Sequence, residues 1–263
     1  MLKLIFAIAI VITILIAGWV PFRKRQKEPH HNHDFMIGET LATGVFLGAA
    51  LLHMLPEANE LFTQLDYGYP YAFLITGAVF LFFLWFEHLG GILYAAEQTC
   101  SKDSHPHAQQ KKSSNHPAFA ILACFMLSIH SLILGTALGI NHNTSIVIML
   151  FLAIITHKWA ESFAIAVQLN KSSLSLRWSS ILFLIFVSMT PLGIWIGWYF
   201  QQGIDNISII NPILIAASAG TFLYLGTLHG LEQCVMVKRC CNLLDFSYVI
   251  IGFLLMAAVA AYT

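Results

Sequence analysis

The sequence predicts an all-α integral membrane protein with eight transmembrane helices. Hydrophobic residues make up 58% of the 263 residues and charged residues only 10%, whereas a soluble domain carries about 25% charged residues. The hydrophobic residues form eight runs of about 17 to 25 residues, the length that crosses a bilayer as a helix. Basic residues fall almost entirely in alternate loops between these runs. These three observations predict the fold class.

The eight runs are expected to build a single domain over residues 1–263. They cover residues 4–20, 38–62, 71–95, 118–140, 146–169, 178–200, 212–231 and 246–262. The first run has Lys3 ahead of it, as a signal peptide would, but its apolar core is long and the segment RKRQK follows directly. We interpret it as a retained span, and cleavage stays open as the alternative.

The basic residues predict the orientation of the chain. Eleven of the 13 Lys and Arg residues fall on one side of the predicted bilayer, Lys3 falls on the other, and Lys158 lies within a span. Cytoplasmic loops carry an excess of such residues. The loops 23–37 and 96–117 are therefore expected in the cytoplasm, and both termini outside. The eleven are Arg23, Lys24, Arg25, Lys27, Lys102, Lys111, Lys112, Lys171, Arg177, Lys238 and Arg239.

The stretch from His130 to Glu161 places ionisable residues inside two apolar spans, where such residues are rare and usually functional. His157 and Glu161 are four residues apart, so they share one helix face. His130 and His157 lie 12 and 11 residues from the predicted starts of their spans. On antiparallel helices both imidazoles fall roughly 16 to 18 Å deep, near the bilayer middle. A single intramembrane His is more often a hydrogen-bonded interior residue, but three matched groups favour a transition-metal site.

Further His and carboxylate pairs occur nearer the ends of the spans. His53 and Glu57, again four residues apart, are expected at the outer end as an entrance that collects cations. Glu87 with His88, and His229 with Glu232, are expected at the inner ends as exit ligands. The alternative for each inner pair is an interfacial anchor without metal. Taken together, the pairs suggest a conduit.

Two predicted cytoplasmic loops contain short His-rich tracts, which are typical of metal binding. A solvated polar linker is the alternative for both. The histidines concerned are His30, His31 and His33 in the first loop, and His105, His107 and His116 in the second.

Several classes of function lack support in the sequence. The formal net charge is zero, so nucleic acid is not an expected partner. The five cysteines form no CxxC pair, and we expect no disulfide framework. GxSxG, Walker A and HExxH motifs are absent, which argues against a Ser hydrolase, an ATP-driven pump and a zincin.

Two local patterns concern the helices themselves. Gly135 and Gly139 have the GxxxG spacing that allows a neighbouring helix to approach closely. Asn211 before Pro212 is typical of an N-cap followed by Pro at the first helical position.

With these residues in place, nearly the whole chain resembles the ZIP (Zrt/Irt-like) family of divalent metal transporters. The matching stretches, in chain order, are ATGVFLGAALLHMLPEA, HSLILGTALG, HKWAESFAIA, TPLGIWIG and AGTFLYLGTLHGLEQ. The resemblance implies a ZIP-type bundle of eight helices with both termini outside. It also implies influx of zinc or iron toward the cytoplasm, with an elevator-like or rocking motion of one helix bundle against another.

The resemblance carries over residue by residue. His130, His157 and Glu161 match the family's metal-binding positions, and Ser131 is a further candidate ligand. This chain departs from many relatives at Leu134, where they have Glu.

Lys158 and Thr190 also differ, because two-metal relatives have acidic residues at or near these positions. While Lys158 keeps its charge it repels a second cation, so we expect one transport metal and no binuclear centre. The sequence offers no obvious acidic partner for Lys158.

The expected function is transport of a divalent metal into the cytoplasm without ATP. A site of two imidazoles and one carboxylate suits Zn²⁺ first and Fe²⁺ next, with Mn²⁺ or Cd²⁺ as further candidate substrates, and no organic cofactor is expected. The partners are the metal ion and the lipid bilayer of a plasma membrane or a bacterial inner membrane, and homodimer formation is left open. The alternatives are a membrane-embedded zinc-dependent hydrolase and a metal receptor that does not translocate.

Overall fold

The computed structural model describes residues 2–23, 35–100, 117–201, 209–228 and 243–261. Every regular element within these ranges is a helix. The elements are α1 (Leu2–Arg23), α2 (Met36–Gly48), the π-helix η1 (Ala49–Met54), α3 (Leu55–Gln64), α4 (Tyr71–Cys100), α5 (Pro117–Ile140), α6 (Thr144–Lys171), α7 (Leu176–Gln201), α8 (Ile210–Tyr224) and α9 (Leu243–Ala260).

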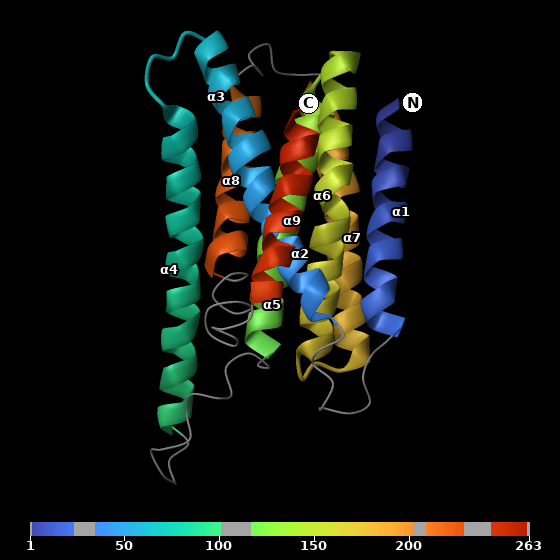
Figure 1. Ribbon diagram of the computed structural model, residues 1–263, viewed down its shortest axis with the longest axis vertical. Coiled ribbons are helices and arrows are strands. Elements are labelled where there is room, and N and C mark those ends of the chain that lie inside the picture. Colours follow the sequence, from blue (N-terminus) through green and yellow to red (C-terminus); the bar gives the residue numbers. More distant parts are fainter. Residues whose placement is uncertain (1, 24–34, 101–116, 202–208, 229–242, 262–263) are drawn as a thin grey trace.

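These helices confirm the predicted fold class. Since α2, η1 and α3 form one continuous helix, the described chain contains eight helical rods, one for each predicted span. Seven of them are long and apolar enough to cross a membrane, and the eighth has a shorter apolar part, Phe246–Ala260. The start of α1 and the end of α9 lie at the same end of the bundle (Figure 1). Which side of the membrane that end faces stays a prediction.

The rods pack as two groups of four. In the first group α5 runs along α7, and α1 packs against α6 and α7. In the second, α2 runs along α9 and α4 runs along α8. The groups meet where α5 touches α8 and where α2 touches α6. In Figure 1, α1 and α4 stand at opposite edges of the bundle, so the contact between the groups lies near its centre.

Glycines make the contact between α5 and α7 a contact of backbone on backbone. A Cβ atom at Gly135 would collide with the carbonyl of Thr190, and one at Gly193 would collide with the carbonyl of Leu132. The close helix approach predicted from the GxxxG spacing is therefore confirmed. This contact holds the helix that carries His130 firmly against its neighbour.

Polar hydrogen bonds add to the apolar packing within each group. Thr76 on α4 donates to the carbonyl of Ala216 on α8. Ser162 on α6 donates to the carbonyl of Ile14 on α1, and Ile14 is fully buried. Helix α1 is thus an integrated part of the bundle, as expected of a span.

The π-helix η1 is a feature that the sequence analysis did not anticipate. It ends two residues before Pro56, which has no backbone N–H to donate and whose ring crowds the carbonyl four residues earlier. A wider π turn relieves that conflict by shifting the hydrogen bonds to residues five apart. The irregular turn contains His53, so it sets the direction in which this side chain points.

The predicted N-cap at Asn211 is wrong. Helix α8 begins at Ile210, with Ile209 as its cap residue. The Asn211 side chain instead accepts a hydrogen bond from Asn141 Nδ2 at 3.4 Å. Because Asn141 follows α5, this contact links the two helix groups, and that tertiary use of the amide overrides the local capping pattern.

Candidate metal centre

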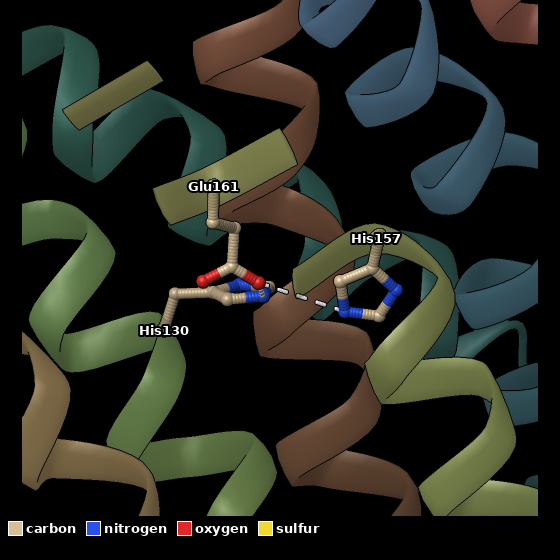
Figure 2. Close-up of side chains that lie close together, drawn as sticks. All are labelled: His130, His157 and Glu161. Carbon is tan, nitrogen blue, oxygen red and sulfur yellow. Dashed lines mark ion pairs between the residues drawn. The ribbon is translucent and has the colours of Figure 1, made fainter. Parts of the chain in front are cut away.

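His130, His157 and Glu161 come together between α5 and α6. The Nε2 atoms of both histidines lie 3.6 Å from Oε1 of Glu161. One potential ligand atom from each residue lies within 4.8 Å of the other two. Figure 2 shows the three side chains pointing toward one another. The structure thus brings together the three residues that the sequence matched in depth.

These side chains are buried with their polar atoms unpaired. His130 and Glu161 are 0% exposed and His157 is 1% exposed. Within the described part of the chain, neither Nε2 atom nor Oε1 of Glu161 has a hydrogen-bond partner. Buried polar atoms are nearly always paired, and exceptions need an explanation. A cation held between the three atoms would supply one.

Two of the three ligand spacings are close to those of a zinc site, and the third, between the two histidines, is at most 4.8 Å. A tetrahedral Zn²⁺ lies about 2.0 to 2.1 Å from each N or O ligand, which places the ligands about 3.4 Å from one another. The two 3.6 Å separations need to close by only a few tenths of an ångström. The three protein ligands leave the fourth position for water, so the ion can be exchanged.

Lys158 has a partner after all, and the partner is Glu161. Its Nζ atom lies 2.8 Å from Oε2 of Glu161 and 2.7 Å from the hydroxyl of Ser131. It also lies over the ring of Phe186, 5.2 Å from the centroid, a distance at which a cation and an aromatic face attract. This pair was not predicted from the sequence, because the whole carboxylate was expected to bind the metal.

Ser131, a candidate ligand from the sequence, contacts the carboxylate oxygen that pairs with the lysine. Its hydroxyl accepts from Lys158 and donates to Oε2 of Glu161 at 3.2 Å. Leu134 is buried one helix turn beyond His130. The carboxylate of Glu161 is therefore divided: Oε2 is occupied by Lys158 and Ser131, and Oε1 faces the two histidines.

Helix α8 of the second group closes the site from the other side. The ring of Phe222 stacks on the His130 imidazole with the centroids 3.8 Å apart, and it meets the His157 ring edge-on at 5.1 Å. Nδ1 of His130 lies 2.5 Å from the hydroxyl oxygen of Thr221. Sequence reasoning found neither residue, although both lie in the stretch AGTFLYLGTLHGLEQ.

His53 and Glu57, the predicted entrance pair, lie close together at one end of their helix. Nε2 of His53 is 3.6 Å from Oε2 of Glu57. Both line a cavity of about 610 Å³ that also includes Glu60 and His142. The cavity is also lined by Met149 and Leu150 of α6, the helix that carries His157 and Glu161. The cavity and the central cluster therefore share helix α6.

The structure describes only one of the two pairs that were predicted at the inner end. Glu87 accepts a hydrogen bond from the Tyr224 hydroxyl, which ties α4 to α8. This contact favours the structural alternative for Glu87, and His88 is exposed. The remaining predicted residues lie outside the described ranges: His229 and Glu232 of the second inner pair, and the loop histidines His30, His31, His33, His105, His107 and His116.

Comparison with known proteins tests the resemblance noted in the sequence. The model of the ZIP zinc transporter family matches residues 1–118 and 95–260, which together span nearly the whole chain. The chain belongs to the ZIP zinc transporter family. Like its family, it is a multi-pass membrane transporter of metal ions rather than an enzyme.

Individual ZIP transporters align along most of their own lengths. Zinc transporter ZIP2 of Mus musculus is 26% identical over 97% of this chain and 96% of its own length. ZIP2 of Homo sapiens is 27% identical over 89% of this chain and 87% of its own. Zinc transporter ZIP1 of Takifugu rubripes is 26% identical over 98% and 97%.

Proposed function

We propose that this ZIP protein carries Zn²⁺ across a plasma membrane or bacterial inner membrane toward the cytoplasm, without ATP, through one site formed by His130, His157 and Glu161. The observation that carries the proposal is the convergence of three buried, unpaired ligand atoms on one point. Two imidazoles and one carboxylate suit Zn²⁺, and Fe²⁺, Mn²⁺ and Cd²⁺ are weaker candidates.

The site holds one metal ion because Lys158 occupies the other side of Glu161. A second cation would need Oε2, which already accepts from the lysine ammonium and from Ser131. It would also lie within a few ångströms of a like charge in a buried site, where such repulsion is poorly screened. The tethered ammonium thus takes the place of a second ion.

The proposed path begins at the outer cavity. His53 and Glu57 gather a hydrated ion there, and the three central ligands then replace most of its water. His229 and Glu232 assist its release inward. The two helix groups are the natural moving parts, because contacts within each group are extensive, and those between groups are concentrated at α5 with α8 and at α2 with α6.

Uptake into proteoliposomes tests the transport site. The wild-type protein is expected to accumulate radioactive zinc over time, and Glu161→Gln, which keeps the size of the side chain but removes its charge, is expected to abolish accumulation. Competition with Fe²⁺, Mn²⁺ and Cd²⁺ ranks the substrates. Zinc bound without accumulation would leave a receptor as the function, and full activity of Glu161→Gln would contradict the site.

The direction of transport needs cells. Expression in a zinc-limited host defective in uptake is expected to raise intracellular zinc and restore growth. A fall in intracellular zinc would reverse the proposed direction.

The number of ions has its own test. Lys158→Asp replaces the tethered ammonium with a carboxylate, so anomalous scattering is expected to locate two ions in the variant and one in the wild type. An unchanged number of ions would contradict the argument from charge.

A further inference from the structure

A hydrogen bond between His130 and Thr221 joins the two helix groups at the metal centre. His130 lies on α5 of the first group and Thr221 on α8 of the second. The His130 Nδ1 atom and the Thr221 hydroxyl oxygen are 2.5 Å apart. Both side chains are buried, with at most 1% exposed. No solvent competes for this bond.

The direction of the bond follows from the other contact of Thr221. A hydroxyl has one hydrogen to donate, and Thr221 donates it to the backbone carbonyl of Ser218 at 2.6 Å. Toward His130 the oxygen can therefore only accept. Nδ1 of His130 must carry the proton, and in a neutral imidazole Nε2 then holds the free electron pair. That nitrogen faces Oε1 of Glu161.

We propose that Thr221 is a positioning residue that holds His130 in the tautomer and ring orientation that the metal requires. The inference rests on the proposed function in that Nε2 of His130 is taken as a metal ligand. Histidine ligands commonly donate their other N–H to a partner that fixes the tautomer, and losing that partner typically costs 10- to 100-fold in metal affinity. Phe222, the next residue on α8, fixes the plane of the same ring by stacking on it.

The location of Thr221 gives this bond a second consequence. The positioning partner belongs to one helix group, and the ligand belongs to the other. Any movement that slides α5 along α8 breaks the bond and leaves the His130 ring free to turn. Metal affinity is therefore high in the arrangement described here and falls when the groups move apart. The protein would bind the ion with high affinity in one arrangement and with low affinity in the next.

Three variants test the positioning role by zinc binding to the purified protein. Thr221→Val keeps the shape but removes the acceptor, and it is expected to weaken zinc binding about tenfold, at the low end of the range for such partners, because the freed carbonyl of Ser218 offers a substitute acceptor. Thr221→Ser keeps the hydroxyl and is expected to bind zinc as the wild type does. The matched control is Thr43→Val on α2, which removes a buried hydroxyl that donates to the Glu39 carbonyl within its own helix.

Nitrogen NMR of ¹⁵N-histidine-labelled, metal-free wild type gives a readout of the tautomer that does not depend on the folding of the Thr221 variants. The His130 signals, assigned by their loss in His130→Ala, are expected to show a protonated Nδ1 and an unprotonated Nε2. An unprotonated Nδ1 would overturn the inference, as would wild-type affinity in Thr221→Val or equal losses in the Val and Ser variants. Failure of the proposed function appears separately, as unchanged zinc binding in Glu161→Gln.

Discussion

Two His and Glu pairs with the same spacing lie in very different surroundings. His53 with Glu57 and His157 with Glu161 are each four residues apart on one helix face, and in each pair Nε2 lies 3.6 Å from a carboxylate oxygen. The pair of His53 and Glu57, called the outer pair after its predicted position, lines an open cavity, and 28% of the Glu57 side chain is exposed. The central pair is buried and gains His130 from a second helix.

The comparison shows that spacing alone does not create a buried cluster of three possible ligands. A spacing of four residues brings two ligands together on any helix, so it predicts a cation-binding pair at either depth. Three features distinguish the central pair: a third ligand residue, burial away from water, and a carboxylate whose second oxygen already accepts hydrogen bonds. These differences predict that equal changes at the two pairs have unequal effects.

The largest effect is expected from Lys158, which has no counterpart at the outer pair. Lys158→Met removes one member of a buried ion pair and leaves the Glu161 charge without compensation on that side. Such a loss typically costs about 3 to 5 kcal/mol, so the thermal midpoint of the metal-free protein in detergent is expected to fall by several degrees. Lys171→Met, which breaks a partly exposed pair with Glu39, is the control and is expected to cost about 1 kcal/mol or less.

The same substitution at the two pairs tests their different roles directly. His157→Ala removes a ligand from the centre, and uptake measured as Vmax/KM is expected to fall by at least about 100-fold, beyond the loss typical of a supporting residue. Zinc binding to the purified protein is expected to be lost in parallel. Retained binding would show that the central cluster is not the principal site.

His53→Ala is the matched variant at the outer pair, and its expected effect is smaller. An entrance raises the local concentration of the ion without holding it during the crossing. The KM for zinc uptake is therefore expected to rise about threefold to tenfold with little change in Vmax, and the difference is expected to shrink at high salt. A fall in Vmax as large as that of His157→Ala would erase the distinction between the pairs.

The smallest effect is expected at the end of the bundle opposite the outer cavity. There Lys171 of α6 pairs with Glu39 of α2 at 2.5 Å, across the two helix groups. A partly exposed pair contributes about 0.2 to 1 kcal/mol, so Glu39→Gln is expected to loosen this end only slightly. A cysteine introduced at buried Ala166 is expected to react with maleimide about two to five times faster in this variant. An unchanged rate would show that the pair does not help to hold the two helix groups together.

Much of the fold could be predicted because a bilayer imposes strong rules. All backbone polar groups must be satisfied within the span, so apolar runs of sufficient length become helices, and the described chain has one helical rod for each of the eight runs. His130, His157 and Glu161 could be grouped because depth along antiparallel helices is simple arithmetic.

The features that were missed all depend on contacts across the fold. Lys158 and Glu161 are only three residues apart in the sequence, yet their ion pair was not predicted. The reason is that one carboxylate can contact two cations, one through each of its oxygens. Thr221 could not be found because nothing local indicates which helix faces His130. Asn211 followed a capping pattern, but its amide contacts Asn141 on the other helix group instead.

The π turn of η1 has a consequence for how this helix can change in length. A π turn closes its hydrogen bonds over one residue more than an α turn, so it behaves as a single inserted residue that the helix has absorbed as a bulge. Deleting Leu51 within it would restore an ordinary turn and leave α3 facing the same neighbours. Elsewhere in a span, deleting one residue would rotate all later residues of the helix by about 100° about its axis. The π turn is therefore the place where this helix can lose a residue while Glu57 stays in the cavity.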